Sequence, residues 1–276
     1  MKLIQTLAEM QAIKHPPSAK IGFVPTMGFL HDGHLSLVAA CRQACDITAV
    51  SIYVNPTQFG PNEDLSSYPR DLDRDLALLQ EIGVDYVFFP NTEMMYPAPY
   101  RTWVDVDDVS SILCGASRPG HFRGVCTVVL KLVNIVKPHY MYMGEKDFQQ
   151  LSILRIMLRD LNLCTEIVAC PIVREADGLA KSSRNVYLKG EHRSIALCLF
   201  TALNQAKQAV SEGVIKVSDI IDAAKQSISK AGAVVDYVEI VDERDFQIPE
   251  MVDEHSRMLI AARVGNTRLI DNQKLI

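Results

Sequence analysis

The stretch that decides the fold is IGFVPTMGFLHDGHLSLVAACRQAC, residues 21–45. Its first part, IGFVPT (21–26), is a short apolar run typical of a buried strand. Its last part, GHLSLVAACRQAC (33–45), carries apolar residues at helical spacing. Between them stand Gly28 and Gly33, and glycine permits the tight turn by which a strand enters a helix. A strand, a glycine-containing turn and a helix in direct succession predict the first unit of an α/β fold.

The same alternation continues along the chain as far as about residue 175. The further strands are expected at 47–54, 84–90, 141–147 (running into a turn) and 165–173. The further helices are expected at 70–83, 122–136 and 148–163, and a polar loop is expected at 55–69. Strands that alternate with helices predict a parallel sheet with helices on both faces, a Rossmann-like α/β architecture.

The pattern changes in the last third of the chain. Two helical stretches, at 189–212 and 217–231, are followed by three short apolar runs. These runs, expected to form strands, are 234–242, 257–264 and 267–272. Helices followed by strands predict a smaller α+β domain. We therefore expect one domain over residues 1–173 and a second over 174–276.

Composition and charge exclude several classes of protein. The 276 residues are 48% hydrophobic and 22% charged, which is ordinary for a globular protein and excludes a disordered chain. The net charge is −5, so the chain lacks the excess of basic residues that is typical of a nucleic-acid-binding protein. The first twenty residues lack the apolar core and cleavage site of a signal peptide, and the longest apolar runs are too short or too polar to span a bilayer. We expect a cytoplasmic protein with no nucleic-acid or membrane partner.

The cysteines point to packing and not to disulfides or zinc. There are seven of them, an odd number, and no two form a CxxC pair. Most lie in apolar runs, where cysteine behaves as a small hydrophobic residue.

The turn between the first strand and the first helix carries two histidines, His31 and His34. Residues three apart at the start of a helix face the same side. A helix N-terminus offers unpaired N–H groups and the positive end of the helix dipole, so this turn is suited to a polyphosphate. A metal half-site, or a helix cap next to a core residue, is the alternative; the lack of further ligands nearby disfavours the metal.

Two other segments carry cationic or hydroxyl side chains near the ends of expected strands. Lys146 lies in MGEKDFQQL (143–151), where a strand meets a helix. Lys181, Ser182, Ser183 and Arg184 follow the strand expected to end near Val173 and form a compact anion clamp. An exposed lysine and an ordinary polar turn are the alternative interpretations. A shared triphosphate site explains all three segments together.

With these residues in view, the sequence closely resembles the pantothenate synthetase (pantoate–β-alanine ligase) family. The matching motifs are PTMGFLHDGH (25–34), VNPTQF (54–59), GHFRGVCTVVLKL (120–132), GEKDFQQL (144–151), READGLAKSSRN (174–185) and RLIDN (268–272). The HxGH and KSSR segments also resemble the signatures of the wider nucleotidylyl-transferase superfamily.

The resemblance implies an ATP-dependent condensation of (R)-pantoate with β-alanine, assisted by Mg²⁺, that yields pantothenate, AMP and pyrophosphate. Pantoyl adenylate is the implied intermediate. The resemblance also implies a homodimer, and a C-terminal domain that acts as a lid and is joined near residues 172–180. No enzyme nucleophile is required, in agreement with the lack of a convincing Ser/His/Asp or Cys/His arrangement.

The resemblance also assigns roles to individual residues. The implied ATP-binding residues are Met27, Gly28, Phe29, Leu30, His31, Asp32, Gly33, His34, Gly144, Glu145, Lys146, Asp147, Val173, Lys181, Ser182, Ser183 and Arg184. Of these, the implied catalytic residues are His31, His34 (the proton donor), Lys146, Ser182, Ser183 and Arg184. Gln58 and Gln150 match pantoate-binding glutamines, and Gln58 also matches a β-alanine contact. Asn55 and Pro25 are weaker matches for the same pocket.

Two features stand apart from these roles. Position 181 is Lys, whereas the family usually has Met or Leu before SSR, so Lys181 adds a phosphate contact or packs its stem over the nucleotide. Asp71, Asp73 and Asp75 lie in an expected helix, where their spacing is typical of a solvated face, and no metal ligand is assigned. The competing functions are a nucleotidylyl transferase that makes a dinucleotide and a non-catalytic nucleotide-binding module.

Overall fold

The computed structural model describes residues 1–276 with the exception of Asn62, which belongs to the loop expected at 55–69. Contacts between Cα atoms divide the chain into two compact units, Met1–Pro171 and Ile172–Ile276. The first contains a six-stranded sheet and the second a three-stranded sheet. Within the described part of the chain, every helix is too short or too polar to cross a lipid bilayer.

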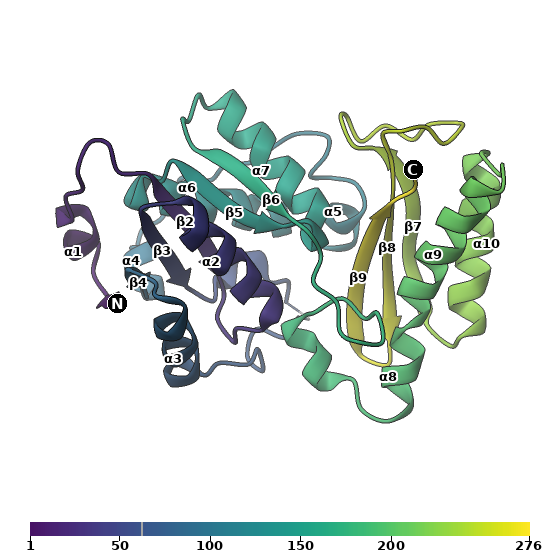
Figure 1. The fold of residues 1–276 in the computed structure, drawn as a ribbon, viewed down its shortest axis with the longest axis horizontal. Helices are drawn as coiled ribbons and strands as arrows, with labels where there is room; N and C mark the ends of the chain where they lie inside the picture. Colours follow the sequence, from purple (N-terminus) through teal and green to yellow (C-terminus); the bar gives the residue numbers. More distant parts are fainter. Residues whose placement is uncertain (62) are drawn as a thin grey trace. The chain divides into compact units, whose positions relative to one another are not determined.

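The sheet of the first unit is parallel throughout, with the strand order β1-β4-β3-β2-β5-β6. Its strands are β1 (Lys2–Ile4), β2 (Ile21–Thr26), β3 (Ile47–Ile52), β4 (Tyr86–Phe88), β5 (Tyr140–Gly144) and β6 (Glu166–Cys170). From β2 the chain steps outward through β3 to β4, then crosses back to β5 and β6 (Figure 1). The strand order therefore reverses between β2 and β5. In sheets of this kind, ligands bind beyond the carboxyl ends of the strands at the reversal.

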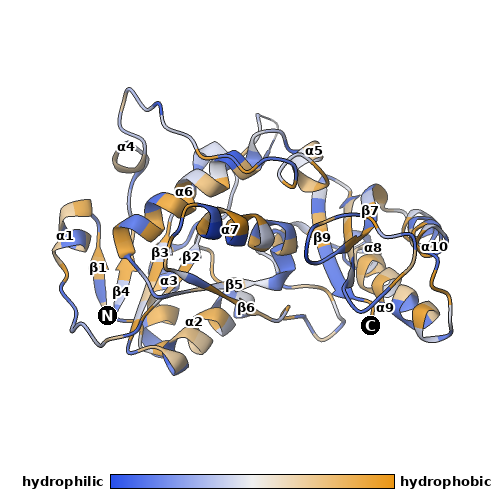
Figure 2. Cartoon of the chain, turned by 90° about the horizontal axis from the view of Figure 1, so that it is seen from above, coloured by the Kyte–Doolittle hydropathy of each residue, from blue (hydrophilic) through white to orange (hydrophobic). Residues whose placement is uncertain are grey.

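Helices cover both faces of this sheet, which confirms the α/β prediction. On one face α2 (Asp32–Ala44) packs against β2, β3 and β5, and α3 (Leu72–Ile82) packs against α2. On the other face α6 (His121–Val136) packs against β2 and against α7 (Phe148–Asp160), which covers β5 and β6; α1 (Leu7–Ala12) packs against α6. Figure 2 shows α2 and the pair α6 and α7 on opposite sides of the sheet.

The helix α2 packs closely on the sheet. Val24 of β2, Val50 of β3 and Val38 of α2 are fully buried in one apolar cluster. A Cβ atom added to Gly22 in β2 would lie only 2.3 Å from Sγ of Cys41 in α2. The missing side chain thus lets the C-terminal part of α2 lie directly on the start of β2.

The second unit is an antiparallel sheet covered by helices. Its strands, in the order β7-β8-β9, are β7 (Val234–Asp242), β8 (Ser256–Val264) and β9 (Thr267–Lys274). The helices are α8 (Glu191–Ala196), α9 (Cys198–Ser211) and α10 (Val217–Lys230). Leu203, Ile228 and Ile260 are fully buried in the core between α9, α10 and the sheet. This is the α+β arrangement predicted for the end of the chain.

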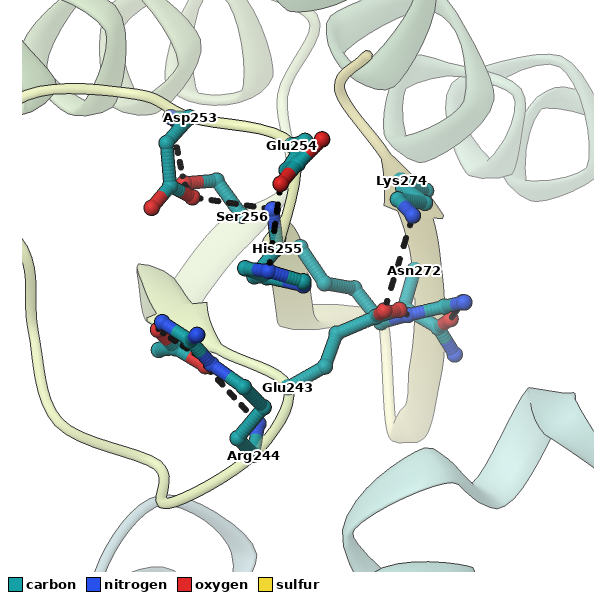
Figure 3. Close-up of polar contacts among 10 residues, drawn as sticks. Glu243, Arg244, Asp253, Glu254, His255, Ser256, Asn272 and Lys274 are labelled. Atoms are coloured by element: carbon teal, nitrogen blue, oxygen red, sulfur yellow. Dashed lines mark hydrogen bonds and ion pairs between the residues drawn. The ribbon is translucent and has the colours of Figure 1, made fainter.

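Polar contacts close one end of this second sheet. Arg257 is buried at 7% exposure, where it donates to Glu243 and, from Nη1, to Oδ1 of Asn272 at 2.6 Å. Glu243 also faces Lys274, and His255 lies 3.5 Å from Glu254 (Figure 3). The buried guanidinium is therefore paired, as the cost of burying a charge requires.

The structure differs from the sequence expectations mainly in short elements and in boundaries. The strand β1 and the helices α1, α4 (Thr92–Met95) and α5 (Cys114–Ser117) were not expected, because so few residues carry no clear period. The stretch 189–212 forms two helices that meet at Leu197. The strand β6 ends before Pro171, which has no N–H to donate to a ladder. All seven cysteines are free, with Cys164 exposed and the other six buried.

Candidate active site

Residues 27–34, which we call the histidine loop, connect the end of β2 to the start of α2. Oγ1 of Thr26 donates to the carbonyl of Ser51 in β3 at 2.7 Å and accepts the N–H of Gly28 at 3.2 Å. Gly28 and Phe29 then both adopt positive φ angles, of 78° and 49°. A left-handed turn at the end of the strand therefore brings the chain into α2.

The two histidines of the loop cap the N-terminus of α2 reciprocally. Nδ1 of His31 accepts the N–H of Gly33 at 3.2 Å, and Nδ1 of His34 accepts the N–H of His31 at 3.4 Å. The ring centroids lie 4.0 Å apart with an interplanar angle of 31°. Because both Nδ1 atoms accept hydrogen bonds, both neutral rings carry their proton on Nε2. Each ring of the pair thus carries an Nε2–H group at the helix N-terminus.

His34 is held in its neutral form. Burial lowers its pKa to about 3, helped by the nearby rings and charges of His31 and Lys146, while Asp147 acts in the opposite direction. A neutral imidazole still donates a hydrogen bond from Nε2. The proton-donor role expected for His34 stays a prediction, and a neutral ring can fill it by donating a hydrogen bond.

Asn55 and Gln58 lie beyond the carboxyl end of β3, in and before the short 3₁₀ helix η1 (Pro56–Gln58). Asn55 is almost fully buried, and its Nδ2 donates to Oε1 of Gln58 and to the carbonyl of Gly124, both at 3.2 Å. Nε2 of Gln58 reaches Sδ of Met27 in the histidine loop at 3.2 Å. Sulfur is a weak acceptor, so the Gln58 amide retains capacity to donate to a ligand.

A second histidine network supports the backbone of Gln58. Nδ1 of His121 donates to the Gln58 carbonyl at 2.8 Å, and Nη1 of Arg118 donates to Nε2 of His121 at 3.0 Å. Two further bonds, of 2.7 and 2.6 Å, join Arg118 to the carboxylate of Glu63. Burial lowers the pKa of His121 to about 4, and Arg118 adds to the effect. His121 is therefore a neutral positioning group.

Gly124 allows α6 to approach this segment. A Cβ atom at Gly124 would lie 2.4 Å from the carbonyl oxygen of Thr57, so no larger residue fits. From the sequence alone, no role is expected for Arg118, His121 or Gly124. The available signal was the GHFRG segment (120–124) at the start of a helix, which contains His121 and Gly124 and which Arg118 precedes by two residues.

Lys146 lies beyond the carboxyl end of β5, in the 3₁₀ helix η2 (Glu145–Asp147) that precedes α7. Its Nζ is 3.6 Å from Oδ2 of Asp147, and its side chain is 21% exposed. Because β5 pairs with β2 in parallel, Lys146 and the histidine loop follow neighbouring strands at the same edge of the sheet, and the Lys146 charge acts on the pKa of His34. The structure thus brings together Met27, the two histidines, Gln58 and Lys146 within the first unit.

The two adjacent glutamines at the start of α7 have different surroundings. Gln149 is buried, and its side chain bonds to the backbone of Cys114, Val109 and Ile112. Gln150 is only partly buried. Gln149 therefore secures the loop before α6, whereas Gln150 remains the candidate for ligand binding.

The KSSR segment lies in the second unit, so the structure leaves its convergence with the histidines a prediction. The N–H of Lys181 donates to the carbonyl of Val173 at 2.9 Å, which closes a short hairpin over 173–181. Ser182 then caps the 3₁₀ helix η3 (Ser183–Tyr187) by accepting the N–H of Arg184 at 3.3 Å. We call residues 173–185 the KSSR hairpin.

Ion pairs hold the KSSR hairpin in place. Arg174 donates to both oxygens of Asp271 at 2.6 and 2.9 Å, and its guanidinium lies over the ring of Phe200. Arg193 is paired with Glu175 and Asp177. These ion pairs therefore hold the backbone that carries residues 181–184.

The interpretation of the three aspartates as a solvated face is wrong for Asp75. Asp71 and Asp73 are exposed, and Asp71 caps α3 by accepting the N–H of Arg74 at 3.1 Å. Asp75 is only 1% exposed, and its two oxygens accept the N–H groups of Phe29 and Leu30, each at 2.7 Å. The tertiary fold turns this one carboxylate towards the histidine loop.

Outside Asn62, the chain has no group of three or more His, Cys, Asp or Glu side chains suited to hold a metal ion.

Polar groups gathered where the strand order reverses define a small-molecule-binding α/β enzyme. The chain belongs to the Pantoate-beta-alanine ligase family, whose model matches residues 2–274. It therefore joins pantoate to β-alanine to form pantothenate, and the family resemblance of its motifs is confirmed.

Relatives and solved structures agree with this assignment. The pantothenate synthetase of Thermosipho africanus is 53% identical over 275 residues and that of Thermotoga petrophila 52% over 276, with 99% of every chain covered. The crystal structure of pantothenate synthetase from Thermus thermophilus matches with a TM-score of 0.95 at 44% identity, covering 100% of this chain and 99% of that one. A pantoate-beta-alanine ligase from Francisella tularensis, described as complexed with beta-gamma ATP and beta-alanine, matches with a TM-score of 0.85 at 34% identity, covering 100% and 98%.

Proposed function

We propose that this ligase uses ATP to activate pantoate as pantoyl adenylate, which β-alanine then converts to pantothenate. The observation that carries the proposal is the pair of Nε2–H donors on His31 and His34, placed at the N-terminus of α2 with Lys146 nearby. The structure of the Francisella tularensis relative with beta-gamma ATP and beta-alanine supports the choice of nucleotide.

Two displacements make up the proposed reaction. A pantoate carboxylate oxygen attacks the α-phosphorus of ATP, the bond from that phosphorus to the bridging oxygen breaks, and pyrophosphate leaves. The amine of β-alanine then attacks the acyl carbon, the carbon–oxygen bond to AMP breaks, and the amine loses a proton. A free carboxylate is a poor acyl donor, because its oxygen is a poor leaving group; adenylation supplies AMP as a good one.

The first displacement brings an anion to an anion, so the site must supply positive charge and fixed donors. In the proposal His31 and His34 donate from Nε2 to phosphate oxygens, and the α2 dipole favours the same charge. Lys146 contributes a full positive charge. The approach of the triphosphate raises the pKa of His34, because a nearby negative charge favours the imidazolium.

The remaining nucleotide contacts follow the family motifs. We assign the histidine loop (27–34), residues 144–147, Val173 and residues 181–184 to ATP, with Ser182, Ser183 and Arg184 on the triphosphate. The Val173 carbonyl already accepts from Lys181, which leaves its N–H and second lone pair for adenine. Lys181 lies next to this contact. Its ammonium group binds a phosphate, or its aliphatic stem packs over the nucleotide.

Gln58 and Gln150 are assigned to pantoate, and Gln58 also to β-alanine. An amide both donates and accepts, so it satisfies hydroxyl and carboxylate groups together. Asn55 holds the Gln58 oxygen, which orients the Gln58 NH₂ group as a donor. Asn55 and Pro25 are proposed to line the same pocket.

We further propose that Mg²⁺ enters as the MgATP substrate complex. Mg²⁺ in such sites is held largely by phosphate oxygens and water.

The domain roles stay proposals. Residues 1–173 bind ATP and pantoate, residues 174–276 form a lid joined near 172–180, and two chains form a homodimer. Light scattering of the purified protein tests the dimer.

The decisive experiment omits one substrate at a time. With pantoate, β-alanine and MgATP together we expect pantothenate, AMP and pyrophosphate in equal amounts, and without β-alanine we expect pantoate-dependent exchange of pyrophosphate into ATP. Turnover that continues without pantoate contradicts the proposal. A dinucleotide formed from ATP and a phosphorylated acceptor indicates a nucleotidylyl transferase, and ATP binding without exchange indicates a binding module.

A further inference from the structure

Asp75 is a buried carboxylate next to the histidine loop that the proposed reaction does not use. It lies in α3, yet it bonds to the loop across 45 and 46 residues of sequence. Oδ2 accepts the N–H of Phe29 and Oδ1 accepts the N–H of Leu30, both at 2.7 Å. Hydrogen bonds to an ionised acceptor are about twice as strong as neutral ones.

The backbone that these two bonds hold is strained. Phe29 has a φ of 49°, in the left-handed region that costs a residue with a side chain roughly 1–2 kcal/mol. Gly28 before it has a φ of 78°, and a Cβ atom there would lie 3.0 Å from Oδ2 of Asp75. The carboxylate thus accepts from two successive N–H groups that this turn directs towards α3.

Arg74 binds the next peptide group of the loop, the one between Leu30 and His31. Its Nη1 donates to the carbonyl of Leu30 at 3.0 Å, and its guanidinium lies 5.5 Å from the centroid of the Phe29 ring. Consecutive residues of α3 therefore bind both the N–H and the C=O of Leu30, one residue before His31.

Packing by itself does not enclose this part of the loop. A cavity of about 560 Å³ lies alongside it, lined by Met27, Gly28, Phe29, Asp75 and residues that follow β3 and β4. The loop thus has room to relax if its contacts with α3 are removed. Burial raises the pKa of Asp75 against the effect of its two backbone bonds. Burying this carboxylate is costly, and its two backbone hydrogen bonds offset part of that cost.

We propose that Asp75, assisted by Arg74, is a positioning residue for ATP activation. It holds the left-handed turn at 28–29 so that His31 and His34 present their Nε2–H groups to the triphosphate. The proposal rests on the proposed function, because it assigns the histidine loop to ATP.

The test compares Asp75→Asn with Asp73→Asn, an exposed aspartate of the same helix. Asparagine keeps one acceptor oxygen and places an NH₂ group against the other backbone N–H. For Asp75→Asn we expect the KM for ATP to rise about tenfold or more and the rate of pyrophosphate exchange to fall, with the KM for β-alanine within about twofold of wild type. Asp73→Asn should match the wild type in every constant.

The outcomes separate the inference from the proposed function. A wild-type enzyme without ATP-dependent ligation refutes the proposed function. If the wild type is active and Asp75→Asn shows the same KM for ATP, the inference is refuted. It is also refuted if Asp75→Asn only lowers the active fraction of the enzyme and leaves all KM values unchanged.

A second variant tests the same positioning role if Asp75→Asn does not fold. Arg74→Gln removes the charge and the ring contact from a side chain that is 47% exposed, so the fold should survive. We expect its KM for ATP to rise about threefold, with an unchanged melting temperature and an unchanged KM for β-alanine. If a folded Arg74→Gln variant has an unchanged KM for ATP, the positioning role proposed for these residues of α3 is overturned.

Discussion

The histidine loop and the KSSR hairpin carry the same kind of proposed task but are held by different forces. In the first unit, Asp75 accepts two backbone N–H groups and the histidines cap α2 through neutral rings. In the second unit, Arg174 and Arg193 form ion pairs with carboxylates, some of them partly exposed. Buried backbone bonds resist salt, whereas exposed ion pairs are screened. The contacts that hold the histidine loop should therefore depend less on salt than those that hold the KSSR hairpin.

The largest expected effect comes from the histidine loop itself. His34→Ala removes an Nε2–H donor to charge that develops on the triphosphate, so adenylate formation should slow by at least about 2–4 kcal/mol, or roughly 30- to 1000-fold. Pantoate-dependent exchange of pyrophosphate into ATP measures the loss.

The matched control is His255→Ala, in the second unit, where the ring lies beside Glu254. That variant should exchange pyrophosphate at the wild-type rate. Near-normal exchange by His34→Ala would remove the assignment of the histidine pair to ATP.

The next largest effect should come from the anchor of the KSSR hairpin. The Asp271 side chain is 3% exposed and that of Arg174 20%, so Asp271→Asn leaves a largely buried guanidinium without its counter-charge. Breaking a fully buried pair costs about 3–5 kcal/mol, and because water reaches Arg174 we expect a loss of less than about 3 kcal/mol. Urea unfolding measures the free energy, and the KM for ATP reports on the hairpin.

A restoring variant sharpens this prediction. Arg174→Gln combined with Asp271→Asn leaves no buried charge and should recover part of the lost stability. A double variant no more stable than Asp271→Asn would show that the ion pair is not what anchors the hairpin.

Acid should weaken the first unit through His34 and His121. The pKa values of His34 and His121 are lowered to about 3 and about 4, from an ordinary value near 6.5. The unfolded state therefore binds protons that the folded state does not, so stability present above pH 6.5 is lost as the pH falls towards 4. Each imidazole contributes a slope of about 1.4 kcal/mol per pH unit within that window.

Urea unfolding of wild type and His121→Gln at pH 7, 6 and 5 checks the slope. The introduced amide does not titrate, so the variant should lose stability less steeply with falling pH. Parallel slopes for the two proteins would exclude His121 as a source of the pH dependence.

The smallest effect should come from the exposed pairs of the KSSR hairpin. Arg193 draws the pKa of Asp177 below its ordinary value through a hydrogen bond, yet the pair is accessible to water. Arg193→Gln should destabilise the second unit by less than about 1 kcal/mol, and the difference should vanish in about 1 M salt. Melting temperatures at low and high salt measure it. A loss that persists at high salt would mean that Arg193 contributes through packing.

By itself, the sequence determined the alternation of strands and helices, the parallel sheet and the place of the histidines. These depend on local periods and turn residues, as in 21–45, and a local pattern is readable without neighbours. The family was also readable, because its motifs are long and ordered along the chain. The roles of His31, His34, Lys146 and the KSSR residues stay predictions until the substrates are tested.

Only the tertiary structure decided which polar residues support the site. The spacing of Asp71, Asp73 and Asp75 is that of a solvated helix face, yet the packing of α3 on α2 turns Asp75 towards the loop. Likewise, nothing local distinguishes Gln149 from Gln150, or reveals that His121 supports the backbone of Gln58. These contacts join residues far apart in sequence, and their partners are known only once the sheet has brought the carboxyl ends of its strands together.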